Sequence, residues 1–217
     1  MNNLKLLGLT AGVGSLILAG SASADFQGIS WTETASSYGN GTCYQIFVDV
    51  QAGDQVNAVY GDGSNALNIS SDSGFYNHGA GGHTCANQTD FMLNLMPSLA
   101  EDSYVTIGLT NATGNAMLEI GIDWAEFNNN GGAIWTDNGS WFATPDDAQV
   151  YEVDGKVLIG CFTVADGDHV YGSINLQGKN ADFSTWTAEG IAFDTVPAPG
   201  ALALLGLAGL AARRRRK

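Results

Sequence analysis

Basic residues are almost absent from most of this chain. The sequence has 217 residues, with 22 Asp and Glu but only 8 Lys and Arg. All 22 acidic residues fall between Asp25 and Asp194, where the only basic residues are Lys156 and Lys179. This acidic part of the chain, which we call the body, should repel nucleic acid and anionic lipid, because both are bound through cationic side chains. The body contains no arginine, and it therefore lacks the usual clamp for phosphate or carboxylate substrates.

Familiar catalytic motifs are also missing. The sequence has no Gly-x-Ser-x-Gly elbow, no His-Glu-x-x-His pair and no phosphate-binding P-loop. With so many acidic residues some close carboxylate pair is inevitable, so acidity alone does not indicate glycoside hydrolysis. His169 stands alone beside a turn, and the group His78, His83 and Cys85 matches no standard metal-ligand spacing. We therefore expect no catalytic residue, no metal centre and no resident cofactor.

Acidic turns leave calcium open as an alternative. Oxygen-rich turns occur around Asp62, Asp137, Asp146 and Asp166. Such loops carry the oxygen ligands that Ca²⁺ prefers. None of them completes an EF-hand loop, and Asp, Asn and Gly stabilise turns without any ion. The plain turn is the favoured interpretation.

Long apolar runs occur only near the two ends of the chain. At the N-terminus, Lys5 is followed by the apolar residues 6–20 and then by Ala22-Ser23-Ala24. A basic residue, an apolar stretch and a small-x-small site are typical of a secretory signal peptide. We predict that residues 1–24 are removed by cleavage between Ala24 and Asp25, so that the mature chain is exported.

The C-terminal apolar run is too short for a lasting membrane anchor. Residues 201–212 carry no charge, and as a helix they would rise about 18 Å against a hydrocarbon core of about 30 Å. Five cations follow: Arg213, Arg214, Arg215, Arg216 and Lys217. This cluster should stay cytoplasmic and leave the body outside. Pro197 and Pro199 give the preceding segment a stiff, extended form. These features predict a transient tether at the inner membrane.

This tail resembles the PEP-CTERM sorting signal. The matching stretches are Val196-Pro197-Ala198-Pro199, the apolar residues from Gly200 to 212, and the arginines 213–216. Ala198 replaces the glutamate that is usual between the prolines. The resemblance covers residues 196–217 and implies cleavage near the prolines by an exosortase, a membrane-embedded, transpeptidase-like bacterial enzyme. It further implies release to the cell surface or the extracellular matrix.

The body, residues 25–195, predicts an all-β domain. In the stretch 43–50, Tyr44, Ile46, Val48 and Val50 fall on one face, as in a half-buried strand. Similar runs occupy 54–61, 103–109, 116–122, 148–153, 156–164, 169–176 and 185–193. One short helical turn is expected near residue 94. These runs favour an antiparallel β-sandwich, of which a jelly roll is one form.

Two connections in the body have the composition of hairpin turns. Asp154-Gly155 separates the runs 148–153 and 156–164 and is a strong hairpin signal. Residues 165–168 connect the runs 156–164 and 169–176, which we expect to form a second hairpin. The stretches 104–109, 136–147 and 157–164 also resemble a set of uncharacterised secreted bacterial proteins that carry the same kind of tail. That resemblance supports the prediction of a β-domain but implies no function.

Three cysteines remain in a chain that we expect to be exported. Export favours disulfides, but an odd number leaves at least one cysteine unpaired within the chain. Cys43 and Cys85 lie near strand ends or loops and are the preferred pair. Cys161 lies inside an apolar run, where it alternates with Val157 and Ile159. We expect it to be a buried small hydrophobic residue and not a nucleophile.

Aromatic residues are the remaining candidates for function. All five tryptophans lie in the body, and exposed aromatic rings can stack on sugars. Core packing is the favoured interpretation, because large aromatic side chains are highly buried on average. We therefore predict an exported, non-catalytic protein that is structural or adhesive in an exopolysaccharide layer. The alternatives are a carbohydrate-binding module, with calcium in one version, and an extracellular glycan-active enzyme.

Overall fold

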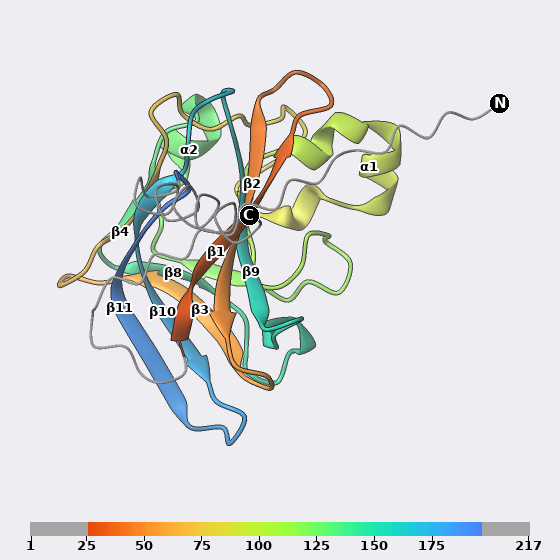
Figure 1. The fold of residues 1–217 in the computed structure, drawn as a ribbon. Coiled ribbons are helices and arrows are strands. Elements are labelled where there is room, and N and C mark those ends of the chain that lie inside the picture. Colours follow the sequence, from red (N-terminus) through yellow and green to blue (C-terminus); the bar gives the residue numbers. More distant parts are fainter. Residues whose placement is uncertain (1–25, 197–217) are drawn as a thin grey trace, which may run out of the picture.

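Two antiparallel sheets pack face to face (Figure 1). The computed structural model describes residues 26–196, and within them the predicted all-β sandwich is confirmed. The predicted signal peptide, the cleavage site at Ala24 and Asp25, and residues 197–217 of the predicted sorting tail lie outside the described residues.

The four-stranded sheet carries the chain's long β2–β9 pairing. Its strands, in spatial order, are β1 (Phe26–Ala35), β2 (Thr42–Val50), β9 (Lys156–Val164) and β5 (Tyr104–Val105). Neighbouring strands are antiparallel throughout. Strand β2 is buried at every second residue, so Tyr44, Ile46, Val48 and Val50 face the second sheet as predicted. Its other residues face outward.

The seven-stranded sheet is organised around one long strand, β10 (Tyr171–Lys179). Along one edge β10 pairs with β11 (Thr185–Asp194). Along its other edge it pairs with β3 and then with β4. The outer strands β8 and β6 extend the sheet beyond β3, and β7 extends it beyond β4. The bounds are β3 (Gln55–Gly61), β4 (Leu67–Ser70), β6 (Leu118–Ile120), β7 (Ile134–Thr136) and β8 (Gly139–Phe142).

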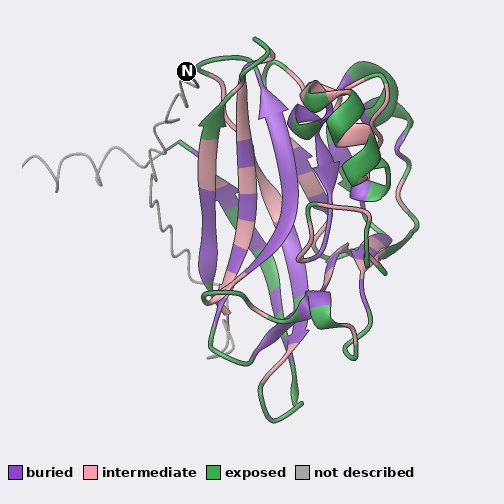
Figure 2. Cartoon of the chain, turned by 90° about the vertical axis from the view of Figure 1, so that its right-hand side faces the viewer, coloured by how far each residue is buried: buried purple, intermediate pink, exposed green. Residues whose placement is uncertain are grey.

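The main core fills the space between the sheets. It includes Ile46 and Val48 from β2, Val59 from β3, Trp141 from β8 and Leu176 from β10, all of them fully buried. Figure 2 shows the buried residues concentrated along the strands, while the loops and the hairpin tips are mostly exposed. Burying this much aliphatic and aromatic surface is the main favourable term in folding.

Short helices lie beside the sheets. The α-helices are α1 (Asp90–Leu95) and α2 (Ala125–Asn130), and the 3₁₀ turns are η1 (Cys85–Asn87), η2 (Pro97–Glu101) and η3 (Ala148–Val150). Helix α1 begins where the Thr89 hydroxyl accepts a hydrogen bond from the Met92 N–H, and proline opens η2. The short helical turn expected near residue 94 is therefore confirmed. Among residues 26–196, no helix is long and apolar enough to cross a membrane.

Several local predictions are wrong. Residues 148–153 form no strand, because Asp147 caps the 3₁₀ turn η3 through the Gln149 N–H. The run 103–109 is a strand only at β5. Residues 165–168 do not form a hairpin, because β9 and β10 belong to different sheets. The chain crosses between the sheets there. Strands β1, β4, β7 and β8 were not predicted.

The Asp154-Gly155 turn is confirmed. Both residues have positive φ, 54° and 77°, as a type I′ turn requires. Val153 and Lys156 exchange two backbone hydrogen bonds across it, at 2.9 and 3.2 Å. The turn leads into β9, the strand that carries Cys161.

Candidate functional site

A cavity of about 430 Å³ lies over the outer face of the four-stranded sheet. The end of β1, the following loop and residues of β2, β5 and β9 line it, together with parts of α1 and η2. Figure 1 shows α1 beside the upper part of this sheet, away from the seven-stranded sheet. Helical segments that pack over one end of an outer sheet face can leave such a hollow between them.

Sulfur atoms form part of the cavity floor. Gln45 of β2 is opposite Cys161 of β9, and Tyr104 of β5 is opposite Cys161 on the other side. Cys43 lies two residues before Gln45 on the same strand face. The Sγ atoms of Cys43 and Cys161 are only 2.7 Å apart. Two cysteines separated by 118 residues in sequence thus meet at one point of the cavity.

A β-bulge explains why Cys161 reaches this face. In the pairing of β2 with β9, Ile46 is opposite Gly160 but Phe47 is opposite Leu158, so Ile159 has no opposite residue. An extra residue on one strand reverses the side on which later residues point. Val157 and Ile159 therefore belong to the main core, whereas Cys161 packs with Tyr104 and Cys85. The predicted burial of Cys161 is confirmed, but its predicted place beside Val157 and Ile159 is wrong.

The two sulfur atoms differ in their chemistry. The hydrogen bond from Cys161 lowers the pKa of Cys43. The same contact, together with burial, raises the pKa of Cys161 well above its ordinary value. Cys161 is 2% exposed, while Cys43 is partly exposed and lines the cavity. In the reduced protein, Cys43 is therefore the sulfur of the pair that ionises first and that is more exposed to solutes in the cavity.

Cys85 lies close to this pair but has other partners. Its sulfur accepts a hydrogen bond from Asn115 Nδ2 at 2.6 Å and lies 3.4 Å from Thr106 Oγ1. Burial raises the pKa of Cys85. The structure thus brings Cys43 to Cys161 and not to Cys85, the partner predicted from the sequence.

Glu101 forms one wall of the cavity. Its carboxylate accepts hydrogen bonds from Ser36 Oγ at 2.5 Å, the Ser37 N–H at 2.6 Å and Asn40 Nδ2 at 2.8 Å. Burial alone would raise the pKa of Glu101, but these donors outweigh burial and lower it. The carboxylate therefore stays ionised and fastens the loop after β1 to η2. It is not poised as a proton donor.

The histidines do not converge. His78 contacts Ser98 Oγ through Nε2 at 3.1 Å. His83 pairs with Glu119 at 2.9 Å and stacks on Trp124, with ring centroids 4.6 Å apart. Within the described part of the chain, no three His, Cys, Asp or Glu side chains gather in a way that could hold a metal ion.

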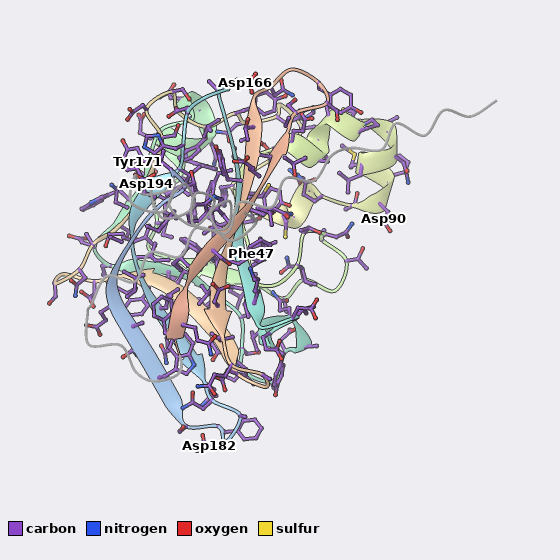
Figure 3. All side chains as sticks on the ribbon, viewed as in Figure 1. Phe47, Asp90, Asp166, Tyr171, Asp182 and Asp194 are labelled. Carbon is purple, nitrogen blue, oxygen red and sulfur yellow. The ribbon has the colours of Figure 1, made fainter. Side chains whose placement is uncertain are left out.

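The carboxylates of two acidic turns, Asp62 and Asp168, are occupied by hydrogen bonds within the protein. Figure 3 shows Asp182 at the tip of the β10–β11 hairpin and Asp166 at the opposite end of the molecule. Asp62 accepts hydrogen bonds from the N–H groups of Ser64 and Asn65. Burial would raise the pKa of Asp168, but hydrogen bonds from two serines hold it well below its ordinary value. Asp62 thus stabilises its own turn, whereas Asp168 joins its turn to the segment 71–73.

No family model, curated protein or solved structure matches this chain.

Most of the tryptophans belong to the core. Trp31, Trp124, Trp141 and Trp186 are at most 9% exposed, whereas Trp135 on β7 is 55% exposed. The prediction that tryptophans pack in the core is thus confirmed for these four residues. A different aromatic residue, Tyr38, lines the cavity and is 54% exposed.

No local pattern in the sequence indicates the cavity. Gln45 and Tyr104 occur in strand-like runs, and Glu101 is one of many acidic residues. The alternation in 43–50 does place Cys43 and Gln45 on the face opposite the core. Nothing local indicates that η2 and the loop after β1 cover that face, because the contacts join segments about sixty residues apart.

Proposed function

We propose that the chain is an exported, non-catalytic protein of the cell surface or extracellular matrix, structural or adhesive in an exopolysaccharide layer. The observation that carries this proposal is the three-part sequence of residues 196–217, which resembles a PEP-CTERM signal. Signal peptidase and an exosortase would process the two ends, with a transient tether at the inner membrane between the two cleavages. The proposed role needs no cofactor.

The end of the folded body is compatible with such processing. Thr195 is 3% exposed; its N–H donates to the Val170 carbonyl, and its hydroxyl accepts from the Val170 N–H, both at 2.9 Å. Val196, the first residue of the proposed sorting motif, is about half exposed. Cleavage after this point would leave the hydrogen bonds of β10 and β11 in place.

The cavity supports a non-catalytic role more than glycoside hydrolysis. Glu101 is the only carboxylate among the residues that line it, and its oxygens are already bonded to the loop after β1. Hydrolysis of glycosides by the common mechanisms uses two carboxyl groups, one of them able to donate a proton. The glycan-active enzyme therefore has no support from this cavity.

Intact mass of the protein from its own cells tests the sorting proposal. In wild-type cells we expect a chain that begins at Asp25 and lacks Lys217, because both ends are removed. In cells without the exosortase, the same protein should retain Lys217 and fractionate with the inner membrane. A variant carrying both Pro197→Ala and Pro199→Ala is the matched control. In wild-type cells this variant should retain Lys217 and fractionate with the inner membrane, as the unmodified protein does in cells without the exosortase. An identical, full-length tail in both strains would contradict the proposal.

Polysaccharide binding at the cavity is the second candidate function, and Tyr38 favours it. An aromatic ring that is 54% exposed, in a cavity also lined by the polar side chains of Ser37 and Gln45, combines a stacking surface with hydrogen-bonding groups. Sugar sites generally need both.

We expect Tyr38→Ala to weaken binding to any glycan recognised by the wild-type protein by about tenfold, as the loss of one stacking contact of about 1.4 kcal/mol implies. Phe91→Ala is the matched control, because Phe91 on α1 is 73% exposed and does not line the cavity. A glycan array probed with and without EDTA measures this effect and the calcium alternative together. Wild-type protein that binds no glycan would remove this candidate.

A further inference from the structure

We propose that Cys43 and Cys161 are joined by a disulfide in the exported protein, and that dissolved thiols can reopen this bond through the cavity. The proposal takes export from the function proposed above and is otherwise independent of the role in a polysaccharide layer. It rests first on the sulfur positions. The two Sγ atoms are 2.7 Å apart, and a disulfide requires about 2.05 Å.

The strand pairing holds the two sulfur atoms together. Cys43 is opposite Thr163 and Cys161 is opposite Gln45, so the cysteines are diagonal neighbours on adjacent antiparallel strands. Diagonal neighbours are about 7–8 Å apart, a separation usually bridged by longer side chains, but here the two Sγ atoms themselves meet at 2.7 Å. The bulge at Ile159 is what places Cys161 on the same face as Cys43. A cross-link here would fasten the two central strands of the four-stranded sheet.

The environment assigns a separate role to each sulfur. Cys43 lines the cavity and has the lowered pKa, which makes it the attacking thiolate. Cys161 also lines the cavity but is only 2% exposed, so an external oxidant reacts first with the more exposed Cys43. The oxidant is a disulfide RS–SR, supplied by an exchange catalyst or by a small molecule of the oxidising compartment.

The exchange balances in two steps. The Cys43 thiolate attacks RS–SR, forming a mixed disulfide and releasing one RS⁻. The Cys161 thiol then loses its proton to solvent, and its sulfur attacks the Cys43 sulfur, forming the Cys43–Cys161 bond and releasing the second RS⁻. The protein loses two electrons, which reduce RS–SR to two thiolates. Reopening is the reverse reaction and begins with attack of an external thiolate on Cys43.

Peptide mapping of the full chain from its own cells tests the pairing without any substitution. Free thiols are first blocked with a maleimide under denaturing conditions, and the protein is then cleaved before aspartates. This cleavage separates the cysteines into the segments 25–48, 72–89 and 154–165. We expect 25–48 linked to 154–165, with the maleimide on 72–89. A link between 25–48 and 72–89 would overturn the proposal.

Serine variants provide a second measurement by the number of maleimide labels. Cys85→Ser should leave no free thiol, whereas Cys43→Ser and Cys161→Ser should each leave two. Two labels on Cys85→Ser would contradict the pairing.

An experiment in solution separates failure of the pairing from failure of export. The reduced full chain is mixed with oxidised glutathione and its mass is followed. Wild type should lose two hydrogens and retain no glutathione, while Cys161→Ser should retain one glutathione on Cys43. If glutathione stays on Cys43 of the wild-type protein, Cys161 cannot complete the exchange and the proposal is wrong. If the bridge forms here but the cellular protein is fully reduced, the pairing is supported and export is contradicted.

Discussion

Replacing Trp141 by alanine is expected to lower the free energy of unfolding by about 3–5 kcal/mol, the usual cost of truncating a buried tryptophan. Trp141 is fully buried in the main core. It lies on β8, between Val59 of β3 and Glu119 of β6. Its indole N–H donates to the Thr106 carbonyl at 3.1 Å. Alanine would leave both a cavity and a buried carbonyl without its donor, which adds about 1 kcal/mol.

The hydrogen bond makes Trp141 more than a packing residue. Thr106 follows β5, and its own N–H donates to Ile159 of β9. The indole therefore links a strand of the seven-stranded sheet to a segment held on the four-stranded sheet. Trp141→Phe, which keeps most of the ring volume, should cost less than alanine.

Trp135→Ala is the matched control for this prediction. Trp135 is 55% exposed on β7, and substitutions at exposed positions usually change stability by less than about 0.5 kcal/mol. Denaturant titration of both variants measures the difference. Equal losses for Trp135→Ala and Trp141→Ala would show that the core does not lie where the structure places it.

Local sequence patterns are sufficient to predict some features of this fold. Residues 43–50 alternate cleanly, and that pattern gave both the strand and the face that Tyr44 and Ile46 bury. The Asp154-Gly155 turn was predicted because its two positive φ angles are a local requirement. Features that depend on a few neighbouring residues could be predicted correctly.

Long-range features could not be predicted in this way. The turn 165–168 has hairpin composition, yet β9 pairs with β2 and β5 and not with β10. The partner of Cys43 depends on the register of β2 against β9 and on a single extra residue, Ile159. A one-residue change reverses which side chains share a face. The positions of Cys43 and Cys85 near strand ends or loops therefore favoured the wrong partner. The cavity could not be predicted from the sequence either, because it also depends on contacts between distant segments.

Asp102→Ala is expected to lower the free energy of unfolding by about 3–5 kcal/mol, because it leaves several buried donors without an acceptor. Asp102 is fully buried. Its carboxylate accepts hydrogen bonds from the N–H groups of His78 at 2.7 Å and Gly82 at 3.0 Å. A Cβ on Gly81 would lie 1.8 Å from the carboxylate, so the glycine-rich stretch 78–83 is closed tightly around it.

The ionisation of Asp102 gives this prediction a second, sharper readout. Burial raises the pKa of Asp102 from 3.8 to about 6, although the backbone N–H groups oppose the shift. Between these two pH values the folded chain holds a proton that the unfolded chain has lost. The contribution of Asp102 to stability is therefore most favourable at pH 4 or below and declines as the pH rises to 6. The decline amounts to about 3 kcal/mol, at about 1.4 kcal/mol per pH unit.

Asp102→Asn isolates this contribution from those of the other carboxylates. Glu101 and Asp168, whose pKa values are lowered, change stability in the opposite direction, since their contribution is lost as the pH falls. Glu101 and Asp168 are present in both proteins, so their contributions to the pH dependence of stability cancel when the variant is compared with wild type. The amide cannot ionise, but its NH₂ group faces one backbone donor, which costs about 1–3 kcal/mol at every pH. Relative to wild type, Asp102→Asn should thus gain about 3 kcal/mol between pH 4 and pH 7. A difference that does not change with pH would mean that Asp102 ionises normally inside the fold, and that its burial is incomplete.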